Sequence, residues 1–262
     1  KTLRALMAIV VILGIAIVAL VFNLQAKNKL PKIKKEPANI SVSEPKTKAT
    51  VSLPFAIKGS ARVFESVVNV RIYEEKNKEI IYEDVAYAKA PDIGQFGDFE
   101  ITIDYLIKRP TTNQVIAETY WTSPKDGSPM DIVRIPLVLN LDNTQNISLF
   151  FSKTLGADTD CSKVYPVARV IAQKDNVSNL LRTTLELLIK GPRFVEQGEE
   201  YASAIDATIK IKDLVIKDGS AKISFDKKIT GKDAQACEEK TATSQIIKTA
   251  TQFSSIKRVE IK

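Results

Sequence analysis

The chain has 262 residues, two cysteines, no histidine and a formal net charge of +7. Nine basic and two acidic residues lie in residues 1–48, which accounts for the whole excess, so residues 49–262 carry equal numbers of the two signs. A nucleic-acid-binding protein concentrates basic charge on its folded domain, so this distribution excludes nucleic acid as a partner. The absence of histidine excludes most schemes for general-base catalysis, nucleophile activation and zinc binding.

Residues 3–24 form one continuous apolar run, LRALMAIVVILGIAIVALVFNL, in which Arg4 is the only charge. About twenty apolar residues in a helix span the roughly 30 Å hydrocarbon core of a bilayer. We therefore expect an N-terminal transmembrane helix within residues 1–24. A cleaved signal peptide is the alternative, although its apolar core usually has about 7–15 residues and ends in a small-x-small site. Here the core is longer, and Leu24-Gln25-Ala26 begins with a bulky residue.

Residues 25–48 are polar, rich in lysine and interrupted by three prolines. This composition predicts an extended linker, because too few apolar residues are present to offset the entropy of ordering. A basic arm that binds anionic lipid headgroups or wall polymer is the alternative role. By the positive-inside rule, the lysines that follow the anchor favour a cytoplasmic location for the domains after it.

Residues 49–141 contain short apolar runs that alternate with period two and are separated by turn signals. Val68, Val70 and Ile72 fall on one face of such a run, and the run DFEITIDYLI continues the alternation from Phe99 to Tyr105. Six or seven strands spaced in this way predict an all-β sandwich.

Residues 142–262 combine strands with two helices. Asn176 is suited to cap the first helix, and Gly191-Pro192 is suited to end it. Asp218-Gly219 predicts a hairpin between two strands, and the second helix is expected at about residues 233–251. The predicted order is β-β-α-β-β-α-β, an α+β domain with its helices on one face of a sheet.

The first domain resembles the immunoglobulin-like domain of bacterial spore-germination proteins. The matching residues are Ser52-Leu53-Pro54-Phe55, Gly59-Ser60-Ala61, Phe64-Glu65, Gly97-Asp98-Phe99, Ser123-Pro124-Lys125-Asp126-Gly127 and Ile135-Pro136-Leu137. The second domain resembles the GerMN domain of sporulation and spore germination. The matching residues are Leu149-Phe150-Phe151, Val164-Tyr165-Pro166-Val167-Ala168-Arg169, Leu187-Leu188-Ile189-Lys190-Gly191-Pro192, Glu196, Asp218-Gly219, Ile223-Ser224-Phe225 and the segment from Gln245 to Phe253.

This resemblance implies a protein anchored in the plasma membrane by a single span, with both domains on the extracytoplasmic side. It implies an envelope or assembly role without enzymatic chemistry, and GerMN-like domains are similar to modules that stack side by side in sporulation and secretion assemblies. The partners expected are the membrane and further copies of the chain or other envelope proteins. Residues 49–141 carry a net charge of −3 and residues 142–262 a net charge of +3, which favours contacts between unlike domains.

Cys161 and Cys237 are the candidates for a disulfide bond, which would be plausible in an exported domain. Two separate buried thiols or a redox site are the alternatives. Arg169 and Glu196 are the candidates for a structural ion pair, on the strength of the resemblance at both positions; the alternative is that Arg169 faces solvent from its strand.

Three aromatic residues, Tyr105, Tyr120 and Trp121, lie in the β-domain. If they formed an exposed row they could stack on sugars, which makes a cell-wall glycan-binding module the alternative function; core packing is the other interpretation. The acidic residues Asp92, Asp98 and Asp104 lack the oxygen-dense spacing of a calcium loop. We therefore expect neither a metal nor a cofactor, and no catalytic residue.

Overall fold

The computed structural model describes residues 38–153, 160–232 and 234–262, and residues 39–262 form one compact unit. The predicted anchor in residues 1–24 and residues 25–37 of the predicted linker lie outside the described residues. Among the residues that are described, no helix has the length and apolar character needed to cross a membrane.

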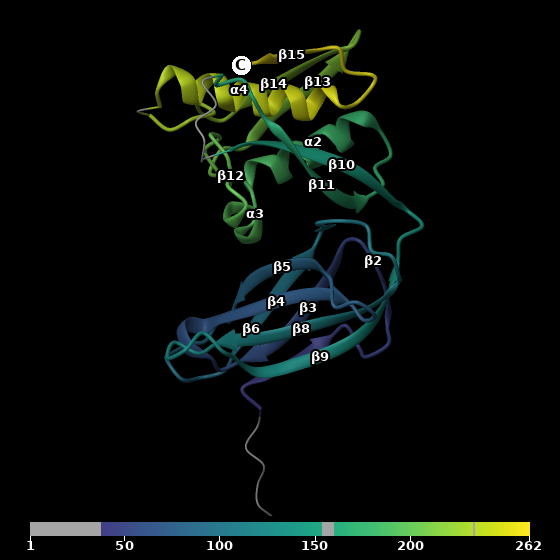
Figure 1. Ribbon diagram of the computed structural model, residues 1–262, viewed down its shortest axis with the longest axis vertical. Helices are drawn as coiled ribbons and strands as arrows, with labels where there is room; N and C mark the ends of the chain where they lie inside the picture. Colours follow the sequence, from purple (N-terminus) through teal and green to yellow (C-terminus); the bar gives the residue numbers. More distant parts are fainter. Residues whose placement is uncertain (1–37, 154–159, 233) are drawn as a thin grey trace, which may run out of the picture. The chain divides into compact units, whose positions relative to one another are not determined.

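The first half of this unit consists of strands and one short 3-10 turn (Figure 1). These elements are β1 (Ile40–Glu44), β2 (Thr50–Ser52), β3 (Phe55–Ala61), η1 (Phe64–Ser66), β4 (Val67–Glu74), β5 (Ile80–Tyr87), β6 (Gly97–Ile103), β7 (Tyr105–Leu106), β8 (Gln114–Thr122) and β9 (Pro129–Asn140). Two sheets form a sandwich, one in the order β1-β3-β6 and the other in the order β2-β9-β8-β4-β5.

The core of the sandwich follows from the alternation in the sequence. Val68, Val70 and Ile72 of β4 are fully buried, whereas Asn69 and Arg71 between them are only half-buried on the outer face. Ile57 of β3 is likewise buried on the opposing sheet. The expectation of a β-sandwich is therefore confirmed for this half, since two faces of alternating strands bury their apolar residues against each other.

The N-terminal boundary of the sandwich differs from the predicted one. Ile40–Glu44, assigned from composition to the linker of residues 25–48, forms β1 and pairs antiparallel with β3. The physical reason is Ile40, which is 1% exposed and belongs to the core. A single buried isoleucine in a polar segment is too weak a sequence signal to indicate a strand.

The second half contains both strands and helices. Its elements are β10 (Thr144–Lys153), β11 (Tyr165–Ala172), α2 (Val177–Ile189), α3 (Phe194–Gly198), β12 (Tyr201–Ala202), β13 (Ile211–Lys217), β14 (Ser220–Phe225), α4 (Ala236–Thr251) and β15 (Arg258–Ile261). The predicted order is present, with α3 and β12 as additions between α2 and β13. Helix α2 begins at Asn176, whose side chain accepts a hydrogen bond from the backbone N–H of Asn179 at 2.9 Å, and it stops before Gly191, which has φ +82°.

The strands of this half form two sheets rather than the single sheet predicted. One has the order β12-β10-β11-β7, and the other has the order β13-β14-β15 with β14 and β15 parallel. Helix α4 packs against β10 and β15, and α2 packs against β10 and β13, so the helices lie between the sheets (Figure 1). The consecutive residues Leu187, Leu188 and Ile189 of α2 are all buried. A stripe facing one sheet would bury only part of that run, and α2 indeed packs against strands of both sheets and against α4.

Candidate functional site

Strand β7 joins the two halves of the unit. The run from Phe99 to Leu106, predicted as one strand, is divided at Asp104: β6 stays in the sandwich, whereas β7 pairs antiparallel with β11. The pairs are Tyr105 with Ile171 and Leu106 with Val170. Tyr105 and Leu106 are both buried although they are neighbours, because each side of the strand now faces packed protein.

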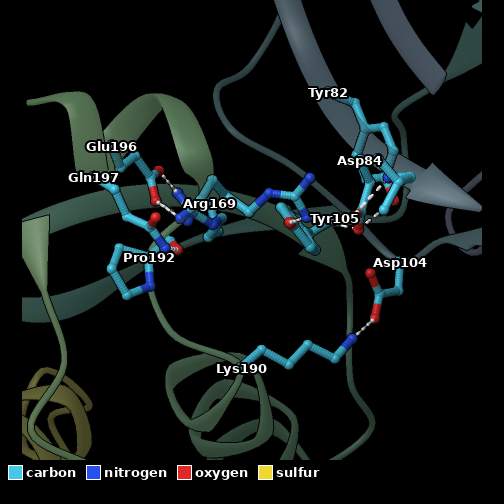
Figure 2. Close-up of polar contacts among 11 residues, drawn as sticks. Tyr82, Asp84, Asp104, Tyr105, Arg169, Lys190, Pro192, Glu196 and Gln197 are labelled. Carbon is cyan, nitrogen blue, oxygen red and sulfur yellow. Dashed lines mark hydrogen bonds and ion pairs between the residues drawn. The ribbon is translucent and has the colours of Figure 1, made fainter. Parts of the chain in front are cut away.

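Arg169 on β11 is the largest side chain that is almost completely buried, at 1% exposure. Its guanidinium forms two parallel hydrogen bonds to Glu196, from Nη1 to Oε1 at 2.6 Å and from Nη2 to Oε2 at 2.8 Å (Figure 2). Nη1 also donates to the carbonyl of Ala168 at 2.8 Å, and the guanidinium lies 5.2 Å from the centre of the Tyr105 ring. The structure thus brings Arg169 and Glu196 together in the geometry that makes such pairs strongest.

Glu196 also organises the backbone beside Arg169. Its Oε2 accepts a hydrogen bond from the backbone N–H of Arg193 at 2.8 Å, as an N-terminal carboxylate does in the first turn of a helix. In the same turn, the side-chain amide of Gln197 donates to the carbonyl of Pro192 at 3.1 Å (Figure 2). The buried pair therefore fixes the segment that carries Arg193.

Arg193 extends from this segment to the first half of the unit. Its Nη1 donates to Asp84 Oδ2 at 2.7 Å and to the hydroxyl of Tyr105, and its guanidinium lies 5.5 Å from the centre of the Tyr82 ring. Asp84 lies on β5, the edge strand of the five-stranded sheet. A second link is more exposed: Lys190 Nζ donates to Asp104 Oδ2 at 2.9 Å. We call Tyr82, Asp84, Tyr105, Arg169, Arg193 and Glu196 the junction cluster.

Burial and neighbouring charges shift the pKa values of Tyr82, Tyr105 and Arg193 in the junction cluster. Burial raises the pKa of Tyr105 to about 12, against the opposing effect of the two arginines, and burial raises the pKa of Tyr82 further. Burial alone would lower the pKa of Arg193, but the hydrogen bond to Asp84 and the electrostatic effects of Tyr105, Asp84 and Tyr82 together outweigh it, so the net shift is upward. Near neutral pH the two phenols are therefore neutral and the Arg193 guanidinium is charged.

The cysteines form a separate feature. Cys161 and Cys237 are joined by a disulfide bond that links the turn before β11 to the first turn of α4. The hydroxyl of Thr241 donates to the Cys161 carbonyl at 2.8 Å, so a hydrogen bond connects the same two segments.

The three aromatic residues do not form a row. Tyr105 is only 4% exposed and lies in the junction cluster, and Trp121 packs against the core while its Nε1 donates to Asp131 at 2.7 Å. Of the three, Tyr120 lies half-buried on the outer face of the sheet beside Arg71, whose guanidinium is 5.0 Å from its ring. In the described part of the chain, no group of His, Cys, Asp and Glu residues has the arrangement of a metal site.

Several residues of the site were not predicted. Asp84 and Arg193 are 109 positions apart, and nothing in a single sequence pairs them. Outside the site, Glu118 was also not predicted: it is 1% exposed and accepts hydrogen bonds from Arg71 and Arg134 at 2.7 Å each on the outer face of the sandwich. Its two partners occupy the neighbouring strands at the same level, which only the strand register reveals.

The fold and the junction cluster define a two-domain protein, in which a β-sandwich is joined to an α+β domain by the β7–β11 pairing and by the Arg193–Asp84 ion pair. Family comparison identifies the domains: residues 39–128 match the immunoglobulin-like domain of bacterial spore germination, and residues 148–262 match the sporulation and spore germination domain. The chain therefore belongs to the proteins that carry this pair of germination and sporulation domains.

Two solved structures are similar to part of the chain. The tandem GerMN domains of the sporulation protein GerM from Bacillus subtilis share 16% identity over 47% of this chain and 40% of that one, with a TM-score of 0.33. A "putative lipoprotein" from Clostridium perfringens shares 23% identity over 47% of this chain and 78% of that one, with a TM-score of 0.29. The match thus spans less than half the length of GerM. No curated protein matched the sequence.

Proposed function

We propose that this protein is a non-enzymatic, membrane-anchored component of the cell envelope whose two domains act as one module for protein–protein assembly. The anchor is the apolar run of residues 3–24, and the domains lie on the extracytoplasmic side. The partners are further copies of the chain or other envelope proteins. The domain families, described by spore germination and sporulation, support this role.

The observation that carries the proposal is the junction cluster. Arg193 of the second domain donates to Asp84 and to the hydroxyl of the buried Tyr105 in the first domain, and independent motion of the two domains would break both contacts. Pairing of β7 with β11 and the Arg193–Asp84 contact instead favour a fixed geometry between the domains. A fixed pair presents a single, preorganised surface, which lowers the entropic cost of assembly.

The net charges of the two domains favour one arrangement of the proposed contacts between copies. The net charges of −3 on residues 49–141 and +3 on residues 142–262 favour contact between the first domain of one copy and the second domain of another. Such a heterologous contact propagates to rings or filaments rather than stopping at a dimer.

Sedimentation of a fragment comprising residues 38–262, over a range of concentrations and salt, tests the proposal. We expect self-association that weakens with salt, because contacts between unlike surface charges are screened. The experiment is run with and without reductant to separate assembly from intermolecular disulfides. A concentration-independent monomer at low salt would rule out self-assembly, and co-purification of envelope proteins with the full chain would then be the test of the remaining partner class.

The location is tested separately in intact cells that produce the full chain. External protease should digest residues 38–262 if they lie outside, and leave them intact if they lie in the cytoplasm. A cytoplasmic protein of the same cells provides the control for lysis.

A further inference from the structure

A cleft of about 1050 Å³ lies beside the junction cluster and is lined by both domains. One wall is the outer face of the sandwich, where Val85, Asn69 and Tyr120 are cross-strand neighbours on β5, β4 and β8. The other wall is the second domain, which contributes Tyr201 of β12 and the segment around Pro192. The volume is at the upper end of the roughly 300–1,000 Å³ typical of small-molecule sites.

The charged groups that line the cleft divide into paired and unpaired sets. Among the residues described, every lining cation has an acidic partner: Arg169 has Glu196, Arg193 has Asp84, Lys108 has Glu79 and Lys190 has Asp104. In the same part of the chain, the side-chain carboxylates of Glu83 and Glu199 have no hydrogen bond or ion pair. The cleft therefore offers free hydrogen-bond acceptors and a local negative charge, which favours ligands that donate hydrogen bonds and disfavours anions.

The two tyrosine rings of the cleft are not available for a cation–π contact with a ligand. Arg71 lies 5.0 Å from the centre of the Tyr120 ring, and Lys153 Nζ lies 3.7 Å from the centre of the Tyr201 ring. Each ring thus already carries a cation on its electron-rich face. A second cation brought by a ligand would be repelled across the ring, whereas the weakly polar C–H face of a sugar would not.

We propose that this cleft is a binding site for a neutral oligosaccharide, with Tyr120 and Tyr201 as stacking surfaces. Glu83 and Glu199 accept hydrogen bonds from its hydroxyl or amide groups, and Asn69 offers a further polar contact. Each domain supplies one tyrosine and one carboxylate, so the site requires both. It is independent of the assembly role, since the cleft could bind a sugar whether or not the chain self-associates.

Calorimetric titration of residues 38–262 with N,N′,N″,N‴-tetraacetylchitotetraose and with cellotetraose tests the site. We expect at least one of these neutral sugars to bind and two controls, the anionic polymer polygalacturonate and the cationic peptide pentalysine, to show no binding. Tyr201→Ala should weaken sugar binding about tenfold, a loss of about 1.4 kcal/mol. Val85→Trp should do the same by filling the cleft from a position that is 39% exposed.

Tyr87→Ala is the matched control, because Tyr87 lies on the same strand as Val85 and is 65% exposed but does not line the cleft. It should leave the affinity unchanged. If Tyr201→Ala proves unfolded by its denaturation profile, Val85→Trp decides the result. The proposal is overturned if neither neutral sugar binds at millimolar concentration, if either charged control binds as tightly as the sugars, or if both cleft variants retain full affinity.

Discussion

Ile171 of β11 pairs with Tyr105 of β7. A strand from the β-sandwich half of the chain thus forms the edge of a sheet in the α+β half. The hydroxyl of the same tyrosine accepts a hydrogen bond from Arg193, and its ring faces Arg169. One residue therefore connects the backbone pairing, the buried ion pair and the contact with Asp84. The stability of the two domains should be coupled through this point.

Replacing Arg193 with methionine should uncouple the domains. The variant keeps an unbranched apolar stem but removes the guanidinium that donates to Asp84 and to the Tyr105 hydroxyl, which should cost about 1–3 kcal/mol. Urea unfolding of residues 38–262 measures the loss, and two separate transitions should replace one.

Lys190→Met is the control for that experiment. The side chains of Lys190 and Asp104 are 62% and 37% exposed. Removing this ion pair should therefore lower the free energy of unfolding by at most about 1 kcal/mol. Equal losses in the two variants would show that Arg193 has no special part in the junction.

The buried pair should behave as a unit in a double-mutant cycle. Arg169→Met and Glu196→Gln should each destabilise the fold by about 3–5 kcal/mol, because each leaves a buried polar partner unpaired. The double variant should lose less than the sum, with a coupling of about 1–3 kcal/mol in urea unfolding. Strict additivity would mean that the two side chains do not stabilise each other.

Opening the disulfide should destabilise the second domain. Cys161 and Cys237 are 76 positions apart, and the chain-entropy model assigns a loop of that size about 4 kcal/mol. Thermal unfolding of Cys161→Ser/Cys237→Ser and of the reduced parent should show the same decrease in midpoint. A decrease in the parent on reduction but not in the double serine variant would point to an effect of the reductant elsewhere.

Acid should weaken the fold through Asp206. The hydrogen bonds from Thr208 and the contact with Lys227 lower the pKa of Asp206 to about 2. Because the folded pKa lies below the unfolded value of about 3.9, this stabilisation is present above pH 4 and is lost as the pH falls towards 2. Urea midpoints at several pH values should therefore fall less steeply for Asp206→Asn than for the parent.

Asp213→Asn is the matched comparison for the acid series. Asp213 is an exposed aspartate of β13 in the same domain, and no described residue bonds to its side chain. This substitution removes a carboxylate from the same domain and leaves the hydrogen bonds of Asp206 in place, so the contribution of Asp206 to the pH dependence should remain. Identical slopes for the parent and Asp206→Asn would contradict the assignment to Asp206.

The elements that sequence reasoning predicted correctly are those whose signals are local. Such signals depend on residues within a few positions of one another. Examples are the cap at Asn176, the helix end before Gly191, and the alternation of Val68, Val70 and Ile72. The elements that were not predicted depend on residues that are far apart in the sequence and close in the fold. The alternation from Phe99 to Tyr105 continues through Asp104, yet the chain leaves one sheet there because β11 offers a partner for β7. Likewise, the burial of Ile40 is decided by β3, not by its polar surroundings.

The β7–β11 pairing has a mechanical consequence. The direct connection between the domains is the short segment 141–143 between β9 and β10, and it would carry any tension applied between Asn39 and Lys262. The hydrogen bonds of β7 and the Arg193–Asp84 contact lie outside that covalent path and resist the same extension in parallel. Tension across the unit is therefore shared between the covalent segment and these non-covalent contacts, and the two domains separate only if the β7–β11 hydrogen bonds and the Arg193–Asp84 contact are lost.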